Sequence, residues 1–115
     1  MRILLLLLLL VSFGSANHIS WLGDYDKALQ KAQEEKKPMM VLLVKKNCKR
    51  CNEVIVEHFM NSDEVDELNE KYVAVIITYE GKLTYPIELF FSTTFPTLFF
   101  VDSTNESFLR EPIYY

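Results

Sequence analysis

The fold of this chain is decided by residues 39–51, which read MMVLLVKKNCKRC. Six apolar residues in a row, with no polar alternation, are typical of a strand that is buried on both faces of a sheet. The strand ends at two lysines, and Asn47 is a good N-cap for a helix that begins at Cys48. The stretch therefore predicts a central strand that runs directly into a helix, with two cysteines in the first helical turn.

A further helix is predicted on the amino-terminal side of this strand. Asp24 can cap it, and Pro38 follows soon after its end. Its apolar residues recur at helical spacing and are Tyr25, Ala28, Leu29 and Ala32. This pattern predicts one amphipathic helix that packs against the sheet.

The carboxy-terminal side continues the alternation of helices and strands. Residues 62–64 open another helix, and residues 72–79 read as a strand. A loop with a short helix at 86–91 leads to a strand at 97–102, a turn, and a last extended stretch at 107–115. This order predicts an α/β sandwich whose central mixed sheet is parallel in its first half, ends in a hairpin and is flanked by helices.

The first sixteen residues form a segment of a different kind. A positive start is followed by nine aliphatic residues at 3–11, and then by the small residues Gly14 and Ala16 at the −3 and −1 positions of a cleavage site. The apolar core is shorter than the ~20 residues that a membrane-spanning helix needs. We expect a signal peptide at 1–16 and a periplasmic or secreted domain at 17–115, with an uncleaved anchor as the alternative.

Composition and charge narrow the function classes. The chain has 115 residues, of which 50% are hydrophobic and 24% charged, and its formal net charge is −4. These values fit one globular domain, which we expect to be a monomer. An acidic chain without a basic stripe also argues against a nucleic acid as partner.

The cysteine count restricts the chemistry further. The only two cysteines, Cys48 and Cys51, are too close in sequence to connect distant parts of a core. They also supply only half of a tetrahedral zinc site, and the only histidines are His18 and His58. We therefore expect no structural metal and no cofactor.

The position of Cys48 predicts a reactive thiol. A free cysteine has a pKa of ~8.5, which a helix amino terminus and nearby cations can lower to ~3.5–7.5. Lys49 and Arg50 would add positive charge beside the sulfur, although they could also be ordinary solvated surface charges. Cys51, one helical turn further on, would be the resolving thiol. His58, two turns away, is expected to be a packing or surface residue and not a base.

With these motifs the chain resembles the thioredoxin superfamily over nearly all of residues 17–115. The resemblance rests on Cys48-Lys49-Arg50-Cys51 at a strand-to-helix junction and on Phe95-Pro96-Thr97 ahead of the hairpin. Trp21 and Lys37-Pro38 make it similar to the secreted group that includes the carboxy-terminal domain of the transmembrane disulfide reductases.

The resemblance implies a substrate site and a class of partner. In this family the proline that corresponds to Pro96 is cis, which leaves the backbone of the residue before it, here Phe95, free to pair with an extended substrate. Phe95 and Pro96 are therefore the expected substrate-binding residues. The expected partners are protein thiols and disulfides, with a membrane disulfide reductase as electron donor.

Several positions depart from the family pattern. Asn47 replaces the usual aromatic residue, Lys49-Arg50 replaces the usual Gly-Pro, and Leu42 replaces a buried acid. These changes bear on the redox potential and not on the fold. The family would also continue beyond Tyr115 into a final helix that is absent from this chain, so we expect either a fragment or another cover for that face.

The function expected first is that of an exported thiol-disulfide oxidoreductase, in which Cys48 and Cys51 are catalytic and Lys49 and Arg50 tune them. A second hypothesis is a soft-metal or redox-sensing module, in which the two thiolates hold Cu(I). A third is a scaffold that recognises peptides through Phe95 and Pro96 with little turnover.

Overall fold

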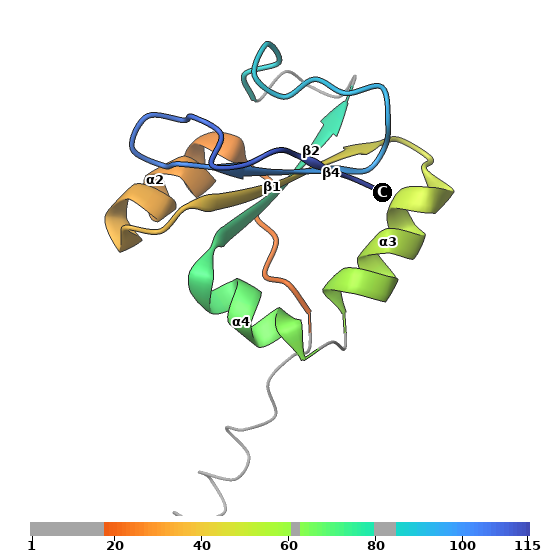
Figure 1. Cartoon of the computed structure of the whole chain (residues 1–115), viewed down its shortest axis with the longest axis horizontal. Helices are drawn as coiled ribbons and strands as arrows, with labels where there is room; N and C mark the ends of the chain where they lie inside the picture. The colour runs from red at the N-terminus through yellow and green to blue at the C-terminus, as the bar shows by residue number, and fades with distance from the viewer. Residues whose placement is uncertain (1–17, 61–62, 80–84) are drawn as a thin grey trace, which may run out of the picture.

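The structure is a computed structural model that describes residues 18–60, 63–79 and 85–115 (Figure 1). The expected signal peptide at 1–16 lies outside the described residues and stays a prediction. In chain order the elements are α2 (Tyr25–Glu35), β1 (Met39–Lys45), α3 (Lys49–Phe59), α4 (Glu64–Lys71), β2 (Val73–Tyr79), β3 (Thr97–Val101) and β4 (Ile113–Tyr114).

The strands form one mixed sheet in the order β2-β1-β3-β4. β1 is parallel to β2 and antiparallel to β3, and β4 is antiparallel to β3. The predicted mixed sheet, with a parallel first half and an antiparallel end, is confirmed. β1 lies between two neighbours, and its residues 39–43 have no solvent exposure, as the unbroken apolar run predicts.

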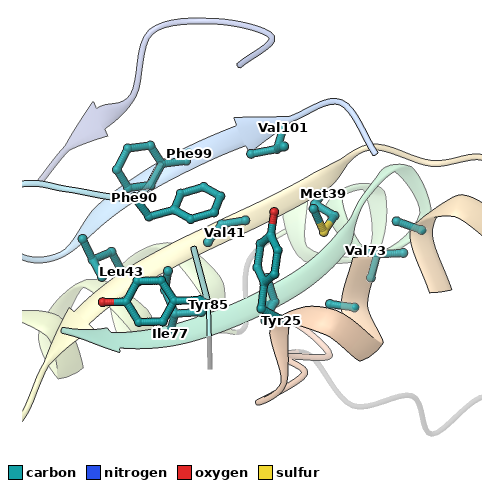
Figure 2. Close-up of a cluster of buried hydrophobic side chains, with 13 residues drawn as sticks. Tyr25, Met39, Val41, Leu43, Val73, Ile77, Tyr85, Phe90, Phe99 and Val101 are labelled. Atoms are coloured by element: carbon teal, nitrogen blue, oxygen red, sulfur yellow. The ribbon is translucent and has the colours of Figure 1, made fainter. Parts of the chain in front are cut away.

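Helices cover both faces of the sheet (Figure 1). Successive side chains of a strand point to opposite faces, so alternate residues of β1 enter two separate cores. The core on the α2 side, shown in Figure 2, includes Tyr25, Ala28, Ala32, Met39, Val41, Leu43, Val73, Val75, Ile77, Phe90, Phe99 and Val101. The core under α3 and α4 consists of Ile19, Met40, Leu42, Val54, Phe59, Val65, Ala74, Leu98 and Phe100.

The two ends of α2 form as the sequence predicts. The Asp24 carboxylate accepts a hydrogen bond from the backbone N–H of Lys27 at 3.0 Å, which caps the amino terminus. At the other end Lys36 takes a left-handed conformation with φ of 56°, and its N–H donates to the carbonyl groups of the last turn. The helix therefore stops just before Pro38 and leaves the chain free to enter β1.

A hydrogen bond ties α2 to the turn after β3. The Tyr25 hydroxyl donates to the Glu106 carboxylate at 2.7 Å, and the tyrosine ring packs edge-on against Phe90. Tyr25 is 1% exposed, so burial, together with this carboxylate, raises the pKa of its hydroxyl far above the ordinary value. The contact joins residues 81 positions apart in sequence.

The carboxy-terminal half departs from the prediction in two places. The predicted short helix at 86–91 is a single turn, in which the N–H groups of Leu89 and Phe90 both donate to the carbonyl of Pro86. The predicted strand at 107–115 is reduced to β4, because Phe108 makes only an isolated bridge with Val101 before the chain bends away. Within the described residues no helix has the length and apolar character needed to span a bilayer.

Candidate active site

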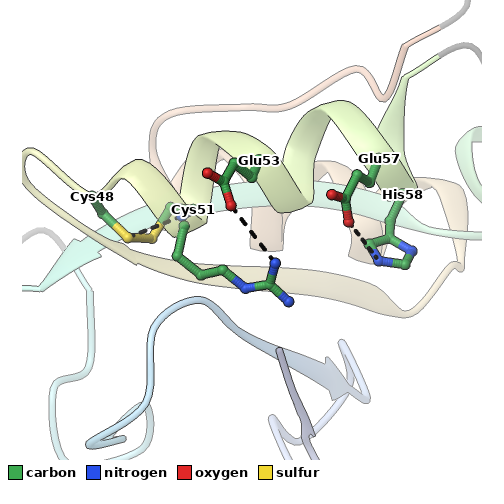
Figure 3. Close-up of polar contacts among 6 residues, drawn as sticks. Cys48, Cys51, Glu53, Glu57 and His58 are labelled. Carbon is green, nitrogen blue, oxygen red and sulfur yellow. Dashed lines mark hydrogen bonds and ion pairs between the residues drawn. A yellow bond between two sulfur atoms is a disulfide. The ribbon is translucent and has the colours of Figure 1, made fainter.

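A disulfide joins Cys48 and Cys51 at the junction between β1 and α3 (Figure 3). Their Cα atoms are 5.2 Å apart. The Cys51 side chain is buried, with 3% exposure, whereas Cys48 is partly exposed. A partner molecule can therefore reach the sulfur of Cys48 more easily than that of Cys51.

Cys48 is the N-cap of α3 and not its first helical residue. Its Sγ accepts a hydrogen bond from the backbone N–H of Cys51 at 3.0 Å. The predicted cap, Asn47, instead takes a left-handed conformation with φ of 54° in the turn that leads to the helix. The prediction of Asn47 as cap is wrong. With Cys48 as the cap, its sulfur bonds one of the first-turn N–H groups that have no partner within the helix itself.

Lys49 and Arg50 are the first two residues of α3, and both are exposed. The Arg50 guanidinium lies 3.8 Å from the Glu53 carboxylate, a contact between half-exposed side chains that is drawn in Figure 3. Lys49 forms no ion pair with any residue that the structure describes. Of the two cations, Lys49 therefore adds more unbalanced positive charge beside the cysteines.

The Phe95–Pro96 segment lies at the same end of the sheet as the cysteines. Because β3 is antiparallel to β1, the pairing of Leu43 with Thr97 brings the start of β3 beside the end of β1. The Phe95–Pro96 peptide bond is cis. Among the described residues, the backbone N–H and C=O groups of Phe95 have no hydrogen-bond partner.

The ring of Phe95 is held by neighbours from the two parallel strands. It packs edge-on against Tyr79, with 5.2 Å between ring centroids, and the Lys45 ammonium lies 5.8 Å from its centroid. Lys45 and Tyr79 are also register partners at the ends of β1 and β2. Neither residue was among the sites predicted from the sequence, because only the parallel pairing brings them together.

Hydroxyl groups that the sequence analysis missed hold the loop before Pro96. The Ser92 hydroxyl donates to the Thr94 carbonyl and accepts from the Thr94 N–H, both at 3.0 Å. The buried Thr97 hydroxyl lies within hydrogen-bond distance of the Ser92 hydroxyl and the Thr94 carbonyl. The sequence contains a signal for these bonds, because a run of serine and threonine at 92–94 lies just before Phe95 and Pro96.

The last described residue connects this loop to the far end of α3. The Tyr115 N–H donates to the Pro96 carbonyl at 3.3 Å, and its ring lies 5.1 Å from that of His58. Burial raises the pKa of the Tyr115 hydroxyl; nearby Glu64 acts in the same direction, and Arg110 opposes it. His58 itself is half exposed, and its Nε2 lies 3.8 Å from Glu57, as expected of a packing and surface histidine.

The described residues contain no cluster of three or more His, Cys, Asp or Glu side chains placed to hold a metal ion. Among the described residues, the two cysteine sulfurs therefore have no third His, Cys, Asp or Glu side chain placed to bind a metal ion with them. What the arrangement can do chemically is to open and close one disulfide at the amino terminus of a helix.

Comparison with known proteins identifies the family and similar folds. The model of the thioredoxin-like family matches residues 20–103. The solution structure of a proposed disulphide-isomerase from Bacteroides thetaiotaomicron is 25% identical, covers 81% of this chain and 78% of its own length, and superposes with a TM-score of 0.66.

A second solved structure, described as DsbH oxidoreductase, is 19% identical, with coverage of 86% of this chain and 74% of its own and a TM-score of 0.60. A comparison with curated proteins found no match. The family match spans most of the chain and includes both cysteines and the proline loop. The chain belongs to the thioredoxin-like family, and its Cys48–Cys51 disulfide lies where β1 meets α3.

Proposed function

We propose that this protein is an exported thiol-disulfide oxidoreductase whose redox pair is Cys48 and Cys51. The observation that carries the proposal is the hydrogen bond from the Cys51 N–H to the Cys48 sulfur at the start of α3. A hydrogen bond to a charged group favours the charged form, so this donor stabilises a thiolate on Cys48 when the disulfide is reduced. The proposed isomerase with 25% identity supports the same chemistry.

The reaction takes two exchange steps. In the first, the Cys48 thiolate attacks one sulfur of a partner disulfide, a mixed disulfide forms, and the other partner sulfur leaves as a thiolate. In the second, Cys51 loses its proton and attacks the Cys48 sulfur, which re-forms the Cys48–Cys51 disulfide and releases the second partner thiolate. Two electrons pass from the protein to the partner, and the same atoms perform the reverse reaction.

Phe95 and Pro96 would position the partner. The backbone groups of Phe95 have no partner among the described residues, so an extended polypeptide can add to them as a short strand. The Phe95 ring beside Tyr79 adds apolar surface at the end of the sheet where β1 leads to Cys48. A membrane disulfide reductase would return electrons to the Cys48–Cys51 disulfide outside the cytoplasm, where the predicted signal peptide directs the protein.

The test is turnover of a dye-labelled peptide disulfide by the purified protein, with dithiothreitol as electron source. We expect catalysis by the native protein and none by Cys48→Ser. Thermal unfolding of both proteins controls for misfolding of the variant. Tight Cu(I) binding by the native protein without turnover would overturn the proposal and favour the soft-metal alternative.

A further inference from the structure

Four cations flank Cys48 in the sequence. Lys45, Lys46, Lys49 and Arg50, here called the basic rim, lie within six positions of one another and are all exposed. They account for four of the twelve Lys and Arg residues in a chain whose net charge is −4. The exposed stretch 45–50 therefore carries the opposite sign of charge to the molecule as a whole.

The basic rim reverses the usual charge pattern of a helix. A helix dipole favours acids at the amino terminus and bases at the carboxy terminus. α4 follows this rule, with Glu64, Asp66 and Glu67 in its first turn and Lys71 in its last. α3 breaks it, because its first turn has two cations and no acid. Positions that break a local rule are expected where function requires it.

The rim is only partly neutralised within the described part of the protein. Arg50 lies 3.8 Å from Glu53, and Lys45 lies over the ring of Phe95. Lys46 and Lys49 have no acidic partner among the residues that the structure describes. The rim can therefore accept acidic groups from another molecule.

The rim also lies beside the surface where a substrate would bind. Lys45 contacts Phe95, and Lys49 and Arg50 directly follow Cys48. A polypeptide that pairs with the Phe95 backbone and presents its disulfide to Cys48 would place its flanking residues against these cations. Opposite charges at this position speed association and stabilise the complex.

We propose that the basic rim selects protein substrates whose disulfide is flanked by aspartate and glutamate. This inference rests on the proposed oxidoreductase function and names the substrate class of the same site. The exchange step is unchanged: the Cys48 thiolate forms a bond to one substrate sulfur, and the other substrate sulfur leaves with the electron pair of the broken bond.

The experiment compares three substrates at equal concentration. Two are peptide disulfides of the same length, one with Asp and Glu and one with Lys around the cysteines, and the third is a small uncharged disulfide. We expect the acidic peptide to have a kcat/KM on the order of 10-fold above the basic one at low salt. Because the charges are exposed, the ratio should fall towards one in roughly 1 M salt, where the Debye length is only about 3 Å.

A matched pair of double variants locates the effect. The chain has two lysines at each end of β1, so Lys45→Gln with Lys46→Gln is compared with Lys36→Gln with Lys37→Gln at the opposite end of the strand. The ratio of acidic to basic rates cancels any change in the reactivity of Cys48. We expect the first variant to lower the ratio by several fold and the second to leave it unchanged.

Each outcome decides one question. Equal rates for the two peptides, or an acidic preference that both double variants retain, overturn the inference while the oxidoreductase function stands. Equal peptide rates combined with rim-dependent binding to phosphatidylglycerol vesicles would assign the rim to a membrane surface and overturn it as well. No turnover of any substrate, including the uncharged one, would instead overturn the proposed function.

Discussion

The backbone N–H of Cys51 points at the sulfur of Cys48, 3.0 Å away. The relationship makes the two cysteines unequal, because Cys48 is the N-cap and partly exposed while Cys51 is buried in the first turn of α3. A charge on the Cys48 sulfur gains a donor and the positive end of the helix dipole. This difference is the basis for proposing Cys48 as the attacking thiol and Cys51 as the resolving thiol.

Replacing Cys51 with Ser should trap mixed disulfides through Cys48, because the thiol that resolves them is gone. Non-reducing electrophoresis with mass spectrometry of the trapped species measures the effect. Cys48→Ser is the matched control and should trap nothing. Trapping by Cys48→Ser at the level of Cys51→Ser would reverse the assigned roles.

Changing Lys49 to Gly and Arg50 to Pro together should raise the pKa of Cys48 and lower the reduction potential. We expect the cations to stabilise the thiolate and hence the reduced protein, which predicts a native potential between about −270 and about −180 mV. Buried Leu42, in place of an acid, acts in the same direction. Thiolate absorbance measured against pH gives the pKa of Cys48, and equilibration with glutathione gives the reduction potential.

Single variants divide this effect between the two cations. Lys49→Gln should change both quantities more than Arg50→Gln, because Glu53 already lies 3.8 Å from Arg50. If the double change leaves both quantities at their native values, the cations have no electrostatic effect on the thiol.

Replacing Tyr25 with Phe should lower the free energy of unfolding by about 1–2 kcal/mol near neutral pH, because the hydrogen bond to Glu106 is lost. The native pKa of Tyr25 is raised above the unfolded value of about 10. The folded state therefore holds the proton more tightly, and its contribution is complete below pH ~10 and lost as the pH rises further. Urea unfolding from pH 8 to 11 should show a shallower alkaline loss in the variant than in the native protein.

Replacing Ser92 with Ala should weaken substrate capture as well as stability. The change removes the hydroxyl that donates to the Thr94 carbonyl, accepts from the Thr94 N–H and lies 2.8 Å from the Thr97 hydroxyl. Thr97 keeps its bond to the Thr94 carbonyl, so we expect a cost of about 0.5–1.5 kcal/mol. Thr93→Ala, an exposed neighbour, is the control and should have little effect. Equal losses of peptide affinity in the two variants would show that the hydroxyl contacts do not position the loop.

The mature amino terminus should be Asn17. Intact-mass measurement of the protein recovered from its native compartment tests this, because cleavage after Ala16 removes a defined mass. A full-length product in the cytoplasm would exclude export and the disulfide-permissive location that the proposed function requires.

Much of the fold could be predicted because its strongest signals are local. The buried run at 39–44 gave β1, and Asp24 gave the start of α2. Details that depend on tertiary contacts could not be predicted. Asn47 has the chemistry of a cap, but the turn after β1 needs a residue with positive φ, which asparagine also tolerates, and the cap passes to Cys48.

The candidate site could also be predicted only in part. The cysteine motif and Phe95-Pro96 are contiguous in sequence, so both halves of the site could be named from it. The residues that complete the site come from other strands, as Tyr79 does from β2, and their contact with Phe95 exists only once β1 and β2 pair. The short helix predicted at 86–91 forms only a single turn.

The pairing of Leu43 with Thr97 has a consequence for the rigidity of the candidate site. One half of the site follows β1 and the other precedes β3, and the ladder between these strands runs through the fully buried centre of the protein. The ends of the two strands can separate only if that buried ladder opens, which costs far more free energy than the motion of a surface loop. A low-energy form that holds Cys48 away from the proline loop is therefore disfavoured, and the two halves of the site keep one relative position throughout the folded state.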